Sequence, residues 1–211
     1  CSLSWFMKSL SEPIARRANA EDHCKGRFWE GRFRSQVLLD ETAVLSAMTY
    51  VDLNPIRAGM TAQLDGSLHT SIVQRIRALE AEQQSDAVPS PPRKEDARQA
   101  KTANQPAALP PILGIRGRLV TRVSTREYIE LVDTTGRQWH PAKRGRITGR
   151  PPAVLGQLGV DADQWVKSVR AVRPEGGFCR AVGSEAALLD KAAAIGQRWL
   201  RGLGIARSLA N

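Results

Sequence analysis

Residues 40–59 read DETAVLSAMTYVDLNPIRAG, and this stretch carries the signals for a helix and for its end. Asp40 is a favoured N-cap residue, because its side chain can accept a hydrogen bond from an N–H of the first turn. Pro55 marks the end, because the residue before a proline is pushed out of the helical region. Between them, apolar residues recur at helical spacing and predict the buried face: Val44, Leu45, Met48 and Val51.

The opposite face of this predicted helix is polar. Ser46, Tyr50 and Asn54 lie four residues apart, so one side of a helix presents all three. A phenol can attack phosphorus when a metal or a base activates it, and a carboxamide one turn away can bind that metal or orient the phosphate. A half-exposed tyrosine followed by an asparagine at a helix end is the simpler explanation, and the spacing by itself favours it.

Further elements are predicted on either side of this helix. The pattern of residues 32–37 alternates between polar and less polar side chains, with the period of two that is typical of a half-buried strand. Residues 70–82 favour a short helix. Another helix is predicted near the start of the chain, where apolar residues share one face: Leu3, Phe6, Met7, Leu10 and Ile14. Because the chain opens inside this pattern, we expect that further residues precede it.

The second half of the chain begins with a linker. Residues 83–111 are rich in Pro, Ala, Ser and Gln without apolar periodicity, which predicts a disordered segment between residues 1–82 and a mostly helical region, 112–211. In that region we expect a helix with a capping box of Ser124 and Glu127, and then two short helices joined at Gly159. A last helix, EAALLDKAAAIGQRWL, should follow Ser184 as its cap. Three tryptophans are predicted to anchor this helical region: Trp139, Trp165 and Trp199.

Charge separates the two halves of the chain. The net charge is +10 and the sequence pI is about 10.2, which favours a polyanionic partner. Residues 113–211 contain 17 Lys and Arg against 8 Asp and Glu, whereas residues 1–62 contain 8 against 7. The affinity for a polyanion should therefore reside in residues 113–211. The 3 cysteines show no paired spacing, which favours a reducing cytoplasm over a disulfide framework, and no apolar run is long enough to span a membrane.

The segment GRFWEGRFRSQVLLDETAVLSAMTYVDLNPIRAGM, residues 26–60, resembles the REP-associated branch of the single-tyrosine HUH transposases. In that family an fW-gRf strand precedes a helix with a Y-x-x-x-N-P-v-R-A-G signature. The preceding LSWFMKSLS and the following TSIVQRI are also similar to family segments, so the resemblance covers roughly residues 2–77.

The resemblance implies an α+β fold that contains part of a ferredoxin-like catalytic domain. It implies that Tyr50 attacks a DNA phosphodiester and forms a 5′-phosphotyrosine, and that Asn54 completes a Mg²⁺ or Mn²⁺ site. The family's other two metal ligands are histidines in an H-x-H pair on an upstream strand, and none of the 3 histidines of this chain lies in such a pair. We therefore expect the C-terminal portion of a transposase, which binds no metal and does not cleave DNA by itself.

DNA contacts are expected in two places, and each has a simpler alternative. Given the resemblance, four arginines are expected to contact phosphates, unless they form a solvated surface: Arg27, Arg32, Arg34 and Arg57. Trp29 can stack an unpaired base or belong to the core. The loop of residues 140–150 supplies three further candidates, Lys143, Arg144 and Arg146, or is simply solvated. The two helices around Gly159 fit either a DNA-reading helix-turn-helix or an ordinary helical corner.

Two functions remain open at this point. The first is a DNA transposase, or its remnant, that acts on single-stranded hairpin DNA in the bacterial nucleoid. The second is a non-catalytic DNA-binding protein derived from a transposase.

Overall fold

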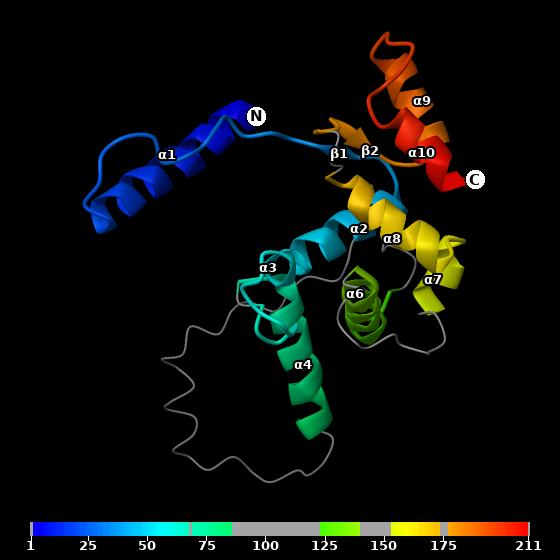
Figure 1. The fold of residues 1–211 in the computed structure, drawn as a ribbon, viewed down its shortest axis with the longest axis horizontal. Helices are drawn as coiled ribbons and strands as arrows, with labels where there is room; N and C mark the ends of the chain where they lie inside the picture. Colours follow the sequence, from blue (N-terminus) through cyan, green and yellow to red (C-terminus); the bar gives the residue numbers. More distant parts are fainter. Residues whose placement is uncertain (1, 68, 86–122, 140–152, 174–176, 211) are drawn as a thin grey trace. The chain divides into compact units, whose positions relative to one another are not determined.

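The computed structural model describes the following parts of the chain: residues 2–67, 69–85, 123–139, 153–173 and 177–210 (Figure 1). The chain divides into two compact units, Cys1–Gln36 and Val37–Asn211, which we call unit 1 and unit 2. Each unit is considered by itself below. Most of the predicted linker lies outside the described residues. None of the described helices is long and apolar enough to cross a membrane.

Unit 1 consists of one helix and the segment that follows it. Helix α1 spans Leu3–Glu21, so the helix predicted from the apolar spacing is confirmed. Two hydrogen bonds hold the following segment to the helix: Trp29 Nε1 donates to the carbonyl of Ser11 at 2.9 Å, and Asn19 Nδ2 donates to the carbonyl of Gly26 at 3.0 Å. A backbone bond adds to these two, because the N–H of Cys24 donates to the carbonyl of Asn19 at 2.9 Å.

The strand predicted over residues 32–37 is wrong for most of its length. Only Val37–Leu38 forms a strand, β1, and it pairs in parallel with β2, Ala181–Val182. The N–H of Val37 donates to the carbonyl of Arg180 at 2.8 Å. In the described part of the chain no strand lies beside residues 32–36, and a strand needs a neighbour to satisfy its backbone groups. The α+β class is thus confirmed in a coarse form, as helices with a two-stranded sheet.

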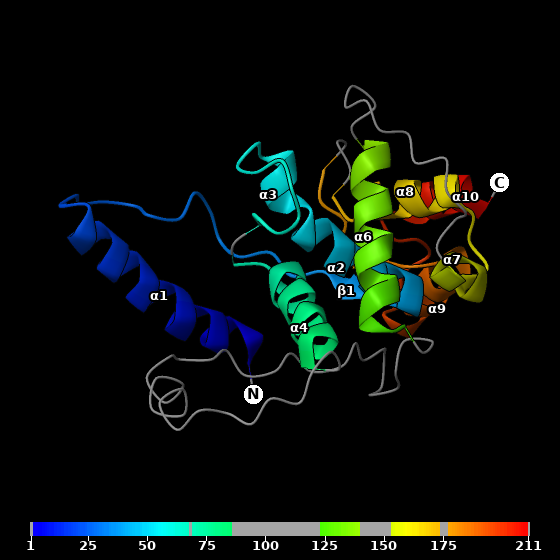
Figure 2. The same cartoon turned by 90° about the horizontal axis from the view of Figure 1, so that it is seen from below.

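Helix α2, Glu41–Asp52, confirms the predicted cap, because Asp40 Oδ1 accepts a hydrogen bond from the N–H of Ala43 at 2.8 Å. The predicted faces of α2 are partly wrong. Val51 is 60% exposed, whereas Ser46 and Thr49 are fully buried. The reason is tertiary: α2 packs against α6, Thr125–Trp139, and α8, Ala162–Ala171, and these two helices cover its small polar residues (Figures 1 and 2).

The main core of unit 2 combines segments from both sides of residues 86–122. Helix α4, Ser71–Ser85, packs against α6, and the short helix α7, Ala153–Leu158, also contacts α6. The buried residues of this core come from these helices, from α8, from α2 and from the residue that follows α2: Leu45, Leu53, Ile72, Val73, Tyr128, Leu131, Val132, Leu155, Trp165, Val166 and Val169. Deleting residues 113–211 would therefore remove 7 of these 11 core residues and would not isolate a folded remainder.

The local signals of this region are largely confirmed. Ser124 and Glu127 form the predicted capping box, with the N–H of Glu127 donating to Ser124 Oγ at 3.2 Å and the N–H of Ser124 donating to Glu127 Oε2 at 2.8 Å. These bonds to the carboxylate lower the pKa of Glu127. Helices α7 and α8 lie on either side of Gly159, as predicted. Trp165 is buried, whereas Trp199 is 67% exposed, which contradicts its predicted core role. The side chain of Trp139 lies outside the described residues.

The last predicted helix is shorter than expected. Helix α9 spans Glu185–Ala194 behind its predicted cap Ser184, and a separate helix, α10, follows at Leu203–Ala210. Gly196 has a φ of 70° and ends α9 in a Schellman motif, because the N–H of Gln197 donates to the carbonyl of Ala192 at 2.9 Å. A smaller cluster holds this part together: Ala181, Leu188, Leu203 and Ala206.

Candidate nucleic-acid interface

The turn after α2 is shaped by its proline and its glycine. Pro55 lies in the first turn of the short helix α3, Asn54–Arg57, where its missing N–H costs no hydrogen bond. Gly59 follows α3 with a φ of 72°. Its N–H donates to the carbonyl of Ile56 at 3.1 Å, and the next N–H donates to the carbonyl of Pro55 at 2.9 Å. The sequence NPIRAG therefore forms a single helical turn, which Pro55 helps to start and Gly59 ends.

This turn brings three of the predicted site residues together. Tyr50 is half-buried near the end of α2, and its ring packs partly against the main core. The guanidinium carbon of Arg57 lies 4.5 Å from the centroid of the Tyr50 ring, within the range of a cation–π contact. Asn54, the first residue of α3, is exposed. We call Tyr50, Asn54 and Arg57 the Tyr50 site.

Behind the Tyr50 site lies a buried carboxylate, Asp52, with a relative exposure of 1%. Its Oδ2 accepts a hydrogen bond from the Tyr128 hydroxyl at 2.6 Å, and both of its oxygens accept from Ser71 Oγ, at 2.9 and 3.1 Å. The N–H of Ile72 donates to Oδ1 at 3.2 Å. Asp52 thus links the end of α2 to α4 and α6. These bonds hold in place the end of the helix that carries Tyr50.

Arg75 of α4 adds a cation beside this carboxylate and phenol. Its guanidinium carbon lies 5.5 Å from the centroid of the Tyr128 ring, and the residue is only 8% exposed. Burial, followed by the adjacent Asp52 carboxylate, raises the pKa of Tyr128, while Arg75 opposes this shift. The phenol therefore holds its proton in the folded protein at a pH where a free tyrosine has begun to lose it.

This shift predicts a loss of stability at alkaline pH. The unfolded chain releases the Tyr128 proton near pH 10, whereas the folded chain retains it, so the contribution is complete below pH 10 and is lost as the pH rises. We expect the free energy of unfolding to fall by about 1.4 kcal/mol per pH unit above pH 10 because of this one group. Urea unfolding between pH 8 and 11, followed by circular dichroism, measures the slope.

Tyr128→Phe provides the control for that measurement. Tyr50 remains in the variant, and the chain has only 2 tyrosines, so the difference between the two proteins belongs to Tyr128. The variant should show a shallower dependence on pH than the wild type in this range. Equal slopes in the two proteins would contradict the buried, proton-retaining phenol.

Asp52 was not identified as a functional residue from the sequence, although one signal was available. A carboxylate in the last turn of a helix is unfavourable, because the C-terminal end of a helix carries partial negative charge. Its presence there indicates compensating donors elsewhere in the fold. Those donors come from residues 71–72 and 128, which no local pattern connects to α2.

The remaining predicted DNA contacts fall in unit 1 or outside the described residues. Arg27, Arg32 and Arg34 are exposed in the segment after α1. Trp29 is 44% exposed and is held by its hydrogen bond to Ser11 and by an edge-to-face contact with Phe28, at 4.8 Å between centroids. The other three candidates lie outside the described residues: Lys143, Arg144 and Arg146.

The donors near the Tyr50 site do not make a magnesium site. Asn54 offers one carboxamide oxygen, whereas Mg²⁺ requires a nearly octahedral oxygen shell. The oxygens of Asp52 are already engaged by three donors inside the core. Across the described ranges no three His, Cys, Asp or Glu side chains are grouped so that they could hold a metal. His23 and His69 are both exposed turn residues with positive φ, of 51° and 68°.

Comparison of the chain with models of protein families, with curated proteins and with solved structures found no match.

Proposed function

We propose that this chain binds single-stranded DNA with hairpin structure, and that it derives from a single-tyrosine transposase of the HUH type whose nucleophile is Tyr50. The observation that carries the proposal is the Tyr50 site. A phenol, a guanidinium and a carboxamide lie within one turn of chain, on a junction that α3 and the Asp52 carboxylate hold in place. We further propose that residues 1–82 represent part of a ferredoxin-like catalytic domain.

The chemistry proposed for Tyr50 is an attack of its oxygen on a DNA phosphorus. A bond forms between the phenol oxygen and phosphorus, and the bond from phosphorus to the 3′ oxygen breaks. The phenol gives its proton to solvent, and the departing 3′ oxygen takes up a proton from solvent to become a hydroxyl. Arg57 would bind a non-bridging phosphate oxygen, because a guanidinium suits phosphate geometry and the residue is exposed beside the Tyr50 ring.

A second candidate function is DNA binding without cleavage. The donor set favours it, because Asn54 is the one predicted metal ligand that the Tyr50 site contains. In this case Arg57 and the basic C-terminal region would hold DNA, and Tyr50 would serve only as a packing platform for the Arg57 guanidinium.

We expect Arg57→Gln to weaken the binding of a single-stranded hairpin oligonucleotide by roughly 5–10-fold, as is typical of the loss of one charge-assisted phosphate contact. The slope of log affinity against log salt should also fall by about 0.7, the value for one phosphate contact on a single strand. Fluorescence anisotropy between 50 and 300 mM salt measures both quantities.

Arg77→Gln is the matched control for this variant. Arg77 is an exposed arginine of α4, outside the Tyr50 site, so the substitution changes net charge by the same amount. We expect its affinity to stay within about twofold of the wild type, because long-range attraction alone is weak at these salt concentrations. If the two variants lost the same amount of DNA affinity, the Tyr50 site would not be part of the DNA interface. Arg57 would then act only through non-specific attraction.

The two candidate functions differ in covalent attachment. We expect the 211-residue chain to bind a hairpin oligonucleotide without forming an adduct that survives a denaturing gel, in Mg²⁺ or in Mn²⁺, because Asn54 is its only predicted metal ligand. An adduct formed by the wild-type chain and lost in Tyr50→Phe would instead establish the transposase chemistry. An adduct that Tyr50→Phe retains would exclude Tyr50 as the nucleophile.

A further inference from the structure

Aromatic and basic side chains are interleaved in a short segment of unit 1 that follows α1. Residues 27–34 read RFWEGRFR, so three aromatic and three Arg side chains occupy eight positions. All six are exposed, and the exposed fractions of Phe28, Trp29 and Phe33 are 42, 44 and 41%. Burial of a ring normally stabilises a fold, so three neighbouring rings in contact with water indicate a surface for a partner.

Trp29 is held in position before any partner binds. Its Nε1 donates to the carbonyl of Ser11 in α1 at 2.9 Å. Its ring also meets the Phe28 ring edge to face, with an interplanar angle of 85° and 4.8 Å between the centroids. Both contacts restrict the indole, yet 44% of the residue remains exposed. A ring that is already fixed loses little conformational entropy when a flat ligand stacks on it.

The charges of the segment indicate which flat ligand it suits. Arg27, Arg32 and Arg34 outnumber Glu30, the one carboxylate among residues 27–34. Within the described part of the chain neither Arg27 nor Arg32 pairs with a carboxylate, whereas two arginines of α1 pair with Glu residues of the same helix. Cations that follow phosphates, beside rings that stack bases, are the usual composition of a site for single-stranded nucleic acid.

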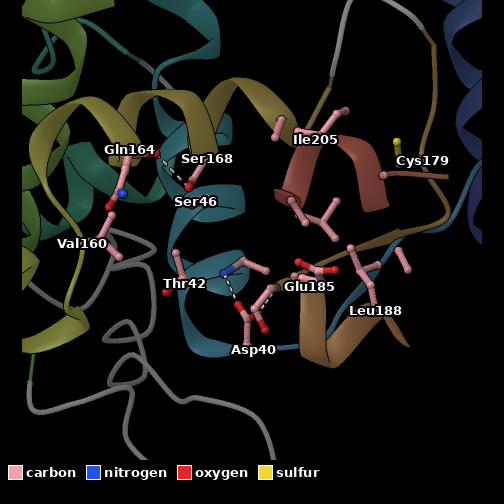
Figure 3. A pocket seen from close by; sticks show the side chains of 18 of the residues that line it. Asp40, Thr42, Ser46, Val160, Gln164, Ser168, Cys179, Glu185, Leu188 and Ile205 are labelled. Atoms are coloured by element: carbon pink, nitrogen blue, oxygen red, sulfur yellow. Dashed lines mark hydrogen bonds between the residues drawn. The ribbon is translucent and has the colours of Figure 1, made fainter. Parts of the chain in front are cut away.

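The pocket of unit 2 offers neither kind of group. Its volume is about 290 Å³, and the described residues that line it include no aromatic, Lys or Arg side chain (Figure 3). Two carboxylates, Asp40 and Glu185, belong to its wall. Negative charge in this wall repels a phosphate, and its aliphatic side chains give a base no ring to stack on. The groups that suit a single strand therefore lie on residues 27–34 and not in the pocket.

We infer that residues 27–34 form a site for single-stranded DNA in which Trp29 and Phe33 each stack on a base. Arg27 and Arg32 bind the neighbouring phosphates. The two rings are four residues apart, so at most about 14 Å of chain separates them and one short oligonucleotide reaches both. Because every base has a face for stacking, the site is tolerant of sequence but requires unpaired bases. The inference rests on the proposed DNA binding, but it needs neither the Tyr50 site nor cleavage.

Two strands of about 12 nucleotides separate stacking from phosphate binding with the full chain: oligo(dT), and an abasic strand of the same length and charge. We expect the wild type to bind oligo(dT) at least about tenfold more tightly in anisotropy titrations at 0.1 M salt, because the abasic strand cannot stack. Equal affinities overturn the stacking site and leave the proposed DNA binding in place. Absence of binding to either strand overturns both.

Trp29→Ala should weaken the binding of oligo(dT) roughly 5–30-fold and leave the abasic strand within about twofold, because it removes a stacking face and no phosphate contact. Trp5→Ala is the matched control: Trp5 of α1 is 68% exposed, and Lys8 Nζ already lies over its ring, 5.2 Å from the centroid. The control should change neither affinity by more than about twofold. Equal losses in the two variants overturn the role of Trp29. A loss in Trp29→Ala that is the same on both strands also overturns it, since that result indicates a structural effect.

Two further variants test the other rings. Phe33→Ala should weaken oligo(dT) binding at least about fivefold without weakening the binding of the abasic strand. Phe28→Leu keeps an apolar side chain but removes the edge-to-face contact that positions Trp29, so a smaller loss of roughly 2–5-fold, again on oligo(dT) alone, is expected. Phe33→Ala without a base-dependent loss overturns the second stacking ring, and the same result for Phe28→Leu overturns the positioning of Trp29 by Phe28.

Discussion

Asp52→Ala should lower the free energy of unfolding by about 3–5 kcal/mol, the usual effect of breaking a buried charged network. The substitution leaves three donors in the core without an acceptor, from Tyr128, Ser71 and Ile72. Since domains of this size are stable by only about 5–15 kcal/mol, most of the folded population of a marginal protein would be lost. Urea unfolding at pH 7, followed by circular dichroism, measures the change.

Two further variants serve as references for the loss of stability in Asp52→Ala. Asp65→Ala removes an exposed carboxylate from the turn before α4 and should change the free energy of unfolding by less than about 0.5 kcal/mol. Tyr128→Phe removes one donor but leaves Asp52 with Ser71 and Ile72, so a loss of about 1–2 kcal/mol is expected. If Asp52→Ala were as stable as Asp65→Ala, the carboxylate would not be the link that holds α2 to α4 and α6.

The second large effect concerns the basic C-terminal region. We expect the removal of four of its exposed charges to weaken the binding of single-stranded DNA on the order of 100-fold at 0.1 M salt, through the loss of counterion release. The four substitutions are Lys167→Gln, Arg173→Gln, Arg180→Gln and Arg198→Gln, and all four side chains are exposed. They leave the chain intact, which a deletion of residues 113–211 would not, because helices of that region supply 7 of the 11 buried residues of the main core.

The matched control removes the same amount of charge from unit 1. In this control, Gln replaces four exposed basic residues that are not predicted DNA contacts: Lys8, Arg16, Arg17 and Lys25. We expect these four Gln substitutions to weaken binding less than about fivefold, since they act only through screened, long-range attraction. Anisotropy titrations at several salt concentrations separate the two variants. Equal losses would show that the excess charge of residues 113–211 does not select that region as the DNA surface.

Local sequence signals were sufficient wherever the deciding interaction lies within a few residues of chain. Asp40, Ser124 and Ser184 were each predicted as helix caps, and each cap accepts the expected backbone hydrogen bond. The end of α2 before Pro55 and the break at Gly159 follow from the same kind of signal. These features depend on backbone geometry and on side chains that reach only the next turn.

A local signal was also available where one prediction was wrong. Gly196 ends α9 by adopting a positive φ, which an uninterrupted helix through residue 200 does not allow. A glycine near the end of a helical pattern is a known stop, so the sequence contained the information. The separate helix α10 follows from that stop and from the burial of Leu203 and Ala206 against Leu188.

The sequence by itself determined the caps, the breaks, the charge of the C-terminal region and the composition of the Tyr50 site, because these depend on residues that are close together in the chain. Only the tertiary structure decided which face of α2 is buried. Helices α6 and α8 cover Ser46 and Thr49, while Val51 remains exposed, so the partners of the helix overrule its apolar spacing. Asp52 shows the same physics, because a buried carboxylate is stable only with donors that the folded chain brings to it from residues 71, 72 and 128.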